Sequence, residues 1–137
     1  MKRQRNFYLL CIVAVVLAGV ASRVLRSGAP LLDKYLGDGL YAALIYLLLS
    51  LAWPSADPAR KGLLAYALVA AIEVFQLTQI PADMARSGNL LLRLGAVVLG
   101  TRFSWLDLLA YAVGIACIFL ADRIVIKKPR SDRQEHE

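Results

Sequence analysis

The sequence has very few of the residues that build metal centres and disulfide frameworks. Its 137 residues include one histidine, His136, and two cysteines, Cys11 and Cys117. Both cysteines lie inside apolar blocks, and neither belongs to a CxxC motif or a Cys/His cluster, so we expect no disulfide framework, no metal site and no cofactor. Cysteines in such blocks are expected to be small buried hydrophobes. HExxH, P-loop and nucleophile-elbow motifs are also absent, so no defined reaction is indicated.

Charged residues are scarce, and basic ones predominate among them. They make up 19% of the chain, with a net charge of +6 and a pI near 9.6. Most Lys and Arg residues flank apolar blocks, and no basic stripe carries interleaved aromatic residues, which excludes a nucleic-acid partner. The pattern instead favours contact with the anionic head groups of membrane lipids.

Apolar residues are abundant and gathered into long blocks. They make up 59% of the chain, and the mean hydropathy is +0.59. Each block approaches the ~20 residues that cross a ~30 Å hydrocarbon layer. We therefore predict an all-α integral membrane bundle of four transmembrane helices that forms a single domain over residues 1–126. The predicted spans are about 7–25, 35–53, 62–80 and 104–122.

Three segments leave alternatives open. The first block could be a signal peptide, because small residues follow its apolar core at 19–22, but the apolar run continues to Val24 and favours an uncleaved span. Segment 84–100 is apolar but short, which predicts an interfacial or re-entrant helix between spans three and four rather than a fifth span. The charged tail, 127–137, is expected to be disordered.

The distribution of Lys and Arg predicts the orientation of the spans. With four spans, ten of the sixteen basic residues fall on the side that holds both termini and the loop 54–61. Basic residues are enriched on the cytoplasmic side of membrane proteins. We therefore expect a multi-pass membrane protein with both termini in the cytoplasm, and the family resemblance described below implies that the membrane is the bacterial cytoplasmic membrane.

Polar residues that are costly to place in a membrane occur in every predicted span. With this orientation they all fall toward the outer leaflet, while the inner halves of the spans look almost purely apolar. Helical spacing places several of them on shared faces. We expect them to line a polar pocket that opens to the outer face. The candidate ligand-binding residues are Arg23, Asp38, Tyr41, Glu73, Gln76, Arg102, Asp107 and Tyr111.

The same residues also permit a purely structural interpretation. Arg102 could pair with Asp107, and Glu73 could pair with Arg23 or Arg102, which would pin the helices together. Gln76 and the tyrosines would then be hydrogen-bonding partners between helices. The charges of Asp33, Lys34 and Arg26 are expected to be solvated in a loop.

Two short signatures resemble those of known bacterial membrane proteins. Glu73-Val-Phe-Gln76 resembles the E-x-x-Q element of VanZ-like proteins, which are associated with teicoplanin resistance. The stretch from Arg102 to Gly114 resembles their R-x4-D-x3-N-x2-G element. The segments KYLGDGLYAALIY at 34–46 and GTRFSWLDLLAYAVG at 100–114 resemble more closely a family catalogued as domain of unknown function 2809, and this likeness extends over about 5–122.

The chain departs from the VanZ-like pattern at two positions. Tyr111 stands where those proteins usually have Asn, and Gly37 stands where their Asp-Lys-x-x-His element has its histidine. A reaction step that depends on this histidine in VanZ-like proteins could therefore not be carried over to this chain. The resemblance implies a cell-envelope membrane protein with an outward-facing polar site.

Several functions fit these observations. The first is binding of an envelope lipid head group, a lipid-linked precursor or a glycopeptide, with Arg102, Arg23 and Arg93 holding phosphate or carboxylate oxygens. The second is an acid/base enzyme acting on envelope lipids through Asp38, Glu73 or Asp107. A structural or accessory subunit is a further alternative, and a homo-oligomer is possible. A carrier is disfavoured because a path to the cytoplasm would need polar residues, which the sequence does not place in the inner halves of the spans.

Overall fold

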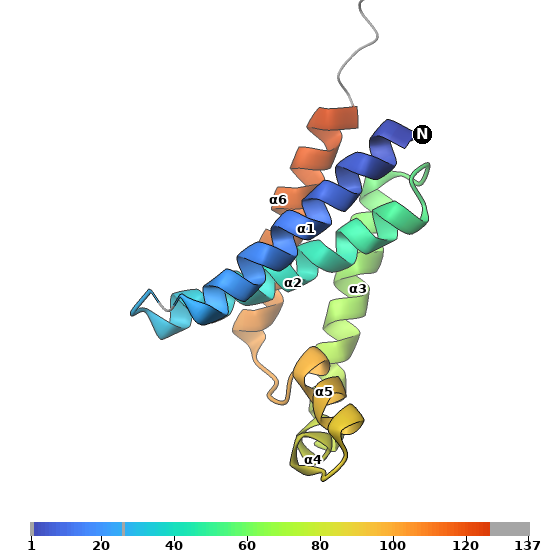
Figure 1. The fold of residues 1–137 in the computed structure, drawn as a ribbon. Helices are drawn as coiled ribbons and strands as arrows, with labels where there is room; N and C mark the ends of the chain where they lie inside the picture. The colour runs from blue at the N-terminus through green and yellow to red at the C-terminus, as the bar shows by residue number, and fades with distance from the viewer. Residues whose placement is uncertain (1, 26, 127–137) are drawn as a thin grey trace, which may run out of the picture.

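The chain folds into six α-helices, which the computed structural model describes over residues 2–25 and 27–126. Figure 1 shows the long helices α1, α2, α3 and α6 in one bundle and the short helices α4 and α5 at one end of it. The described residues contain no β-strand. The tail and Arg26 lie outside the described residues. The helices are α1 (Lys2–Val24), α2 (Pro30–Ala52), α3 (Pro58–Gln76), α4 (Ile80–Arg86), α5 (Leu90–Leu99) and α6 (Trp105–Ile126).

Proline and capping residues set the start of the second and third helices. α2 begins at Pro30 and α3 at Pro58, where the missing N–H costs nothing and the fixed φ angle suits a helix. The Asp57 carboxylate also accepts hydrogen bonds from the N–H groups of Ala59 and Arg60, at 3.0 and 3.3 Å. Both helices therefore start four or five residues before the predicted spans.

The third apolar block is bent where the sequence predicts a continuous span. α3 ends at Gln76 and α4 begins at Ile80, and the two helix axes differ by 70°. Gln79 adopts a left-handed conformation with φ of 64°, which ends the helical path, and Pro81 follows at the start of α4. Segment 84–100 accordingly does not form one helix, because it holds the end of α4 and all of α5.

The bundle is held together by a narrow core beneath a wide apolar surface. α2 and α6 cross where Gly39 meets Gly114, and a Cβ added at Gly114 would lie 2.7 Å from the Gly39 Cα. The closely packed core consists of Ala42, Tyr46, Ala65, Val69, Tyr111 and Ile115. Leucine and valine side chains cover the outside of α1, α5 and α6. Cys117, expected to be buried, is exposed on α6.

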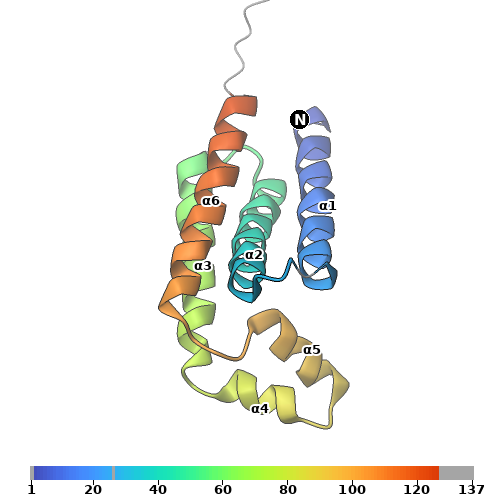
Figure 2. The same ribbon diagram turned by 90° about the vertical axis from the view of Figure 1, so that its left-hand side faces the viewer.

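Three helices are long and apolar enough to cross a membrane, and the bent pair of α3 and α4 would add a fourth. An apolar exterior of this kind is stable in lipid rather than in water. Figures 1 and 2 show that the start of α1, the α2–α3 loop and the end of α6 share one end of the bundle. We call this the terminal end and the opposite one, which carries α4 and α5, the α4–α5 end.

Candidate functional site

A buried carboxylate organises the α4–α5 end. Glu73, on α3, has no exposed surface. One of its oxygens, Oε1, accepts a hydrogen bond of 2.7 Å from the backbone N–H of Ser104, and Oε2 accepts one of 3.0 Å from the Tyr111 hydroxyl. The Gln76 amide donates to the same Oε2 at 3.3 Å and to the Leu99 carbonyl at 2.7 Å. This carboxylate therefore ties α3 to α6, to the α5–α6 loop and to the end of α5.

The close approach at Gly100 explains how the end of α5 reaches Gln76. Gly100 has φ of 75°, a conformation that favours glycine, and it ends α5. A Cβ at this position would lie 2.8 Å from the Gln76 Nε2 atom. Glycine is therefore required both by the backbone conformation and by the space.

A second polar pair joins α2 to α6 near this carboxylate. The Lys34 Nζ atom lies 2.7 Å from Asp107 Oδ1, with the lysine side chain 47% exposed and the aspartate 6% exposed. Asp38 lies one helical turn beyond Lys34, and its Oδ2 atom is buried without a hydrogen-bond partner. The charged groups that act on Asp38 are Asp107, Lys34, Glu73 and Arg23.

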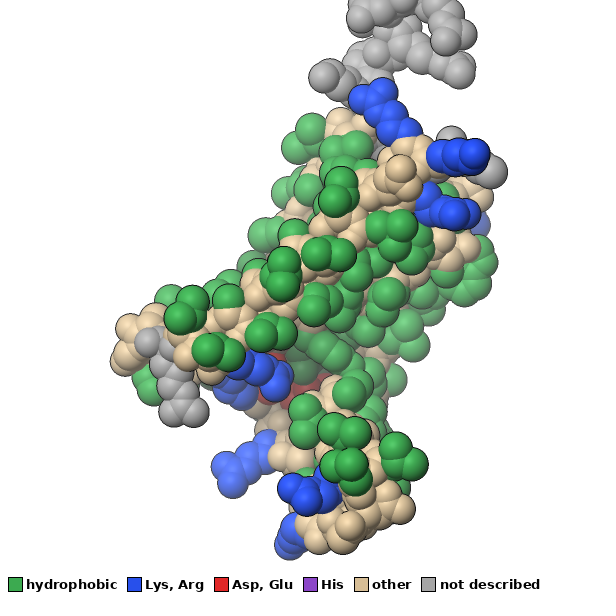
Figure 3. All heavy atoms as spheres, in the orientation of Figure 1, with side chains coloured by type: hydrophobic (Ala, Val, Ile, Leu, Met, Phe, Trp, Pro, Cys, Tyr) green, Lys and Arg blue, Asp and Glu red, His purple; other side chains and the backbone are tan. Residues whose placement is uncertain are grey.

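Four arginines surround the hollows beside these groups. One hollow of about 470 Å³ is lined by Arg23 from α1 and Arg93 from α5, and a neighbouring one of about 600 Å³ by Arg86, Arg102 and Gln76. Ala85 and Thr101 line both hollows. Figure 3 shows acidic side chains inside a hollow whose rim carries basic ones. Arginine side chains in such a setting suit phosphate or carboxylate groups.

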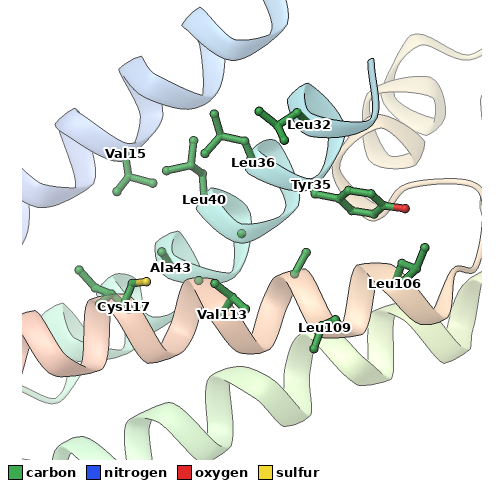
Figure 4. Close-up of a pocket in the computed structure, with 14 residues that line it drawn as sticks. Val15, Leu32, Tyr35, Leu36, Leu40, Ala43, Leu106, Leu109, Val113 and Cys117 are labelled. Carbon is green, nitrogen blue, oxygen red and sulfur yellow. The ribbon is translucent and has the colours of Figure 1, made fainter. Parts of the chain in front are cut away.

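An apolar groove of about 700 Å³ runs between α1, α2 and α6. Figure 4 shows the side chains that enclose it, among them Leu32 and Leu36 from α2 and Val113 and Cys117 from α6. It extends along α6 from Leu106 to Ile118, which is about 18 Å of helix and a little over half of a hydrocarbon layer. The groove therefore has the depth of about one leaflet.

Several contacts differ from those expected from the sequence. Among the described residues neither Arg23 nor Arg102 pairs with Glu73, because both arginines are exposed while the carboxylate is enclosed by donors from its own bundle. Asp107 pairs with Lys34 instead of Arg102, so Lys34 is not a solvated loop charge. Lys34 therefore belongs to the site, although it was not among the predicted site residues.

The predicted residues thus fall into two groups. Glu73, Gln76 and Tyr111 are directly hydrogen-bonded, and the Tyr41 ring packs near Tyr111 with a centroid separation of 6.5 Å. Arg23 and Arg102 lie at the rim in separate hollows.

A buried polar cluster occupies the terminal end, where the inner halves of the spans were expected to be almost purely apolar. At the terminal end, Asp122 accepts hydrogen bonds from the hydroxyls of Tyr8 and Tyr46 at 2.8 and 2.5 Å. The Lys61 ammonium lies 3.1 Å from the same carboxylate. Ser50 is buried beside them with its hydroxyl unpartnered. This cluster joins α1, α2, α3 and α6.

Sequence reasoning missed this cluster for a local reason. Lys61 was assigned to the loop 54–61, but the proline-capped start of α3 extends the helix past it into the bundle. Two signals were available: a carboxylate within the apolar run of α6, and a tyrosine and a serine spaced one turn apart at 46 and 50.

No group of three or more metal-ligating side chains is found among the residues that the structure describes. No solved structure matches the chain. Residues 28–115, more than half of the chain, match a family described as "Protein of unknown function (DUF2809)". The matched region contains every polar residue of the site described above except Arg23.

Proposed function

We propose that this chain, which belongs to the DUF2809 family of proteins of unknown function, binds a membrane lipid through an anionic head group. The arginine-lined hollows at the α4–α5 end would hold the head group. The observation that carries the proposal is the convergence of Arg23, Arg93 and Arg102 from three segments beside a buried polar interior. Exposed guanidinium groups on an apolar bundle are placed to meet phosphate oxygens at a lipid surface.

The apolar groove supports a lipid rather than a glycopeptide as the ligand. Its lining is mostly aliphatic, with Tyr35 and Cys117 beside the leucine, valine and isoleucine side chains, and it is about as deep as one leaflet. Its end at Leu32 and Leu106 lies at the starts of α2 and α6, on the side of the bundle that carries the arginines. A lipid could therefore place an acyl chain against α2 and α6 with its phosphate at the level of the basic rim.

The architecture proposed with this function is a four-span bundle in the bacterial cytoplasmic membrane. In the bent pair, α3 forms the third span and α4 continues the chain out of the hydrocarbon layer. α5 lies at the membrane surface with its exposed leucines and valines in lipid. Both termini lie in the cytoplasm, so the site faces outward. The resemblance to VanZ-like envelope proteins agrees with this placement.

The enzyme alternative has less support than binding. Glu73 has no exposed surface, and both of its carboxylate oxygens already accept hydrogen bonds from the protein. A general acid or base must come within hydrogen-bonding reach of the proton it moves. This carboxylate therefore suits a structural role under a binding site.

Native mass spectrometry of the detergent-solubilised protein tests the proposal. The probes are phosphatidic acid and diacylglycerol with the same acyl chains, which differ by the phosphate alone. The wild-type protein should retain phosphatidic acid in preference to diacylglycerol, and a variant with Arg93→Ala and Arg102→Ala should lose most of this preference. Arg60→Ala, which removes an exposed arginine at the terminal end, is the matched control. Equal retention of the two lipids by the wild-type protein would contradict the proposal.

A further inference from the structure

The polar interior at the α4–α5 end has more acceptors than donors. Asp38 Oδ2 and the Gln76 Oε1 atom are both buried without a hydrogen-bond partner. Gln76 is only 4% exposed, and its amide nitrogen is already engaged by Glu73 and Leu99. A buried acceptor without a donor costs free energy. The interior therefore has two places where a ligand that donates hydrogen bonds would be stabilised.

Negative charge also exceeds positive charge in this interior. Asp107 is compensated by Lys34, and Glu73 accepts hydrogen bonds from neutral donors alone. Asp38 forms no ion pair among the described residues, although Lys34, one turn away on α2, and Arg23 lie close enough to act on it, so that one lysine serves both Asp38 and Asp107. A carboxylate in a half-buried setting is stabilised by a cation. The charge distribution therefore favours a cationic donor over a neutral one.

The rim has the opposite character. Arg23, Arg93 and Arg102 are exposed and form no ion pair within the described part of the chain, whereas Arg86 is paired with Asp83 at 2.9 Å. Gln76 and Arg102 line the same hollow. A single head group can thus reach an unpartnered acceptor and a guanidinium together.

We propose that the ligand is a zwitterionic phospholipid whose head group carries a phosphate and a primary ammonium group. This inference rests on the proposed function, because the phosphate occupies the arginine-lined hollows. The ammonium group points inward to Asp38 and Gln76. An ammonium group has three donors and no acceptor, which matches an interior with two unpartnered acceptors and one lysine shared by two carboxylates.

Competition between two lipids that share a phosphodiester and acyl chains tests the inference. Phosphatidylethanolamine carries a primary ammonium, and phosphatidylcholine carries a trimethylated one that cannot donate an N–H hydrogen bond. The wild-type protein should retain the ethanolamine lipid about tenfold better in native mass spectrometry, a difference that corresponds to about 1.4 kcal/mol. Asp38→Asn should remove this preference.

Asp33→Asn is the matched control, because it removes another carboxylate of α2 that bonds to Ser27 in the adjoining loop. It should leave the preference for phosphatidylethanolamine in place. Thermal unfolding of both variants in the same detergent identifies any loss of folding, and Asp38→Glu, which keeps the charge, should retain part of the preference if Asp38→Asn proves unstable.

The outcomes separate this inference from the function on which it rests. Equal retention of the two diester lipids, together with a preference for phosphatidic acid over diacylglycerol, would overturn the ammonium site and leave the phosphate site standing. Persistence of the ethanolamine preference in Asp38→Asn would also overturn the inference. Loss of both preferences in the wild-type protein would overturn both proposals.

Discussion

Lys61 and Asp122 face each other inside the terminal end of the bundle, with Nζ and Oδ2 3.1 Å apart and each side chain 2% exposed. The carboxylate also accepts hydrogen bonds from the hydroxyls of Tyr8 and Tyr46, and the ammonium lies 5.2 and 5.5 Å from the centroids of their rings. The pair thus links the two helices that carry it to α1 and α2. A buried pair with this many partners is expected to be sensitive to the loss of either charge.

Removal of one charge of this pair should destabilise the fold strongly. Lys61→Met leaves Asp122 buried without its cation, which is expected to cost about 3–5 kcal/mol of unfolding free energy. The double variant Lys61→Met, Asp122→Asn should be more stable than the single Lys61→Met variant because no charge remains uncompensated. Equilibrium unfolding in detergent measures both effects.

The exposed pair of Asp83 and Arg86 provides the comparison. Both side chains are 73% exposed, so Asp83→Asn should change the unfolding free energy by less than about 1 kcal/mol. Similar losses for the buried and the exposed pair would show that Lys61 and Asp122 are solvated in the folded protein.

The contrast between this cluster and the opposite end shows what the sequence could predict. Glu73 and Gln76 lie three residues apart on one helix, so their shared face follows from helical periodicity, and the spacing of Asp107 and Tyr111 is equally local. The partners of Glu73 were not predictable in this way, because the Ser104 N–H group reaches it through the tertiary path of a loop. Hydropathy alone also placed Lys61 in the loop between the second and third predicted spans.

The bend after Gln76 has a similar explanation. The apolar run continues to Ile80, so the mean hydropathy of this segment predicts one continuous span. Gln79 adopts a left-handed backbone conformation although it is not glycine. The amino-acid composition of the segment does not predict this conformation. All-helical architecture and apolar helices were predictable, whereas the break that positions α4 and α5 was not.

The crossing of α2 and α6 should tolerate no side chain at position 114. A Cβ on Gly114 would come within 2.7 Å of the Gly39 Cα, and the contacting atoms belong to backbone. Gly114→Ala should therefore force the helices apart and cost about 1–3 kcal/mol. Thermal unfolding in detergent checks this value.

Two other glycines serve as controls for that substitution. Gly39→Ala places its Cβ 3.4 Å from the nearest atom, and Gly19→Ala meets nothing within 4 Å. Gly39→Ala should be milder than Gly114→Ala, and Gly19→Ala should be neutral or slightly stabilising because alanine favours helix. An equal loss in all three variants would argue against close packing at this crossing.

The hydroxyl of Tyr111 should contribute to the stability of the α4–α5 end. Tyr111→Phe removes the 3.0 Å hydrogen bond to Glu73 and leaves that buried carboxylate with one donor fewer, which is expected to cost about 1–3 kcal/mol. Tyr41→Phe is the matched control, since the Tyr41 ring packs near Tyr111 without a hydroxyl bond in the described residues. A larger loss for Tyr41→Phe would contradict the assigned role.

The link between α5 and α3 can be isolated with a pair of glycine variants. Gly28 and Gly100 both have positive φ angles, 84° and 75°, so alanine is strained at each. Only at Gly100 would the new Cβ also meet a side chain, at 2.8 Å from Gln76 Nε2, whereas Gly28 has nothing within 4 Å. Gly100→Ala should therefore destabilise more than Gly28→Ala and speed hydrogen exchange at the end of α5. Equal hydrogen-exchange rates at the end of α5 in the two variants would show that Gln76 does not hold the end of α5 against α3.

The proposed orientation determines which reagent reaches each end of the bundle. Gly88 lies between α4 and α5, Ser55 lies in the α2–α3 loop, and both are exposed. In a background with Cys11 and Cys117 replaced by alanine, a membrane-impermeant maleimide added to intact cells should label Gly88→Cys and not Ser55→Cys. Ser55→Cys should react after the cells are permeabilised. The opposite pattern would place the arginine-lined hollows in the cytoplasm, where their phosphate ligand would come from the inner leaflet.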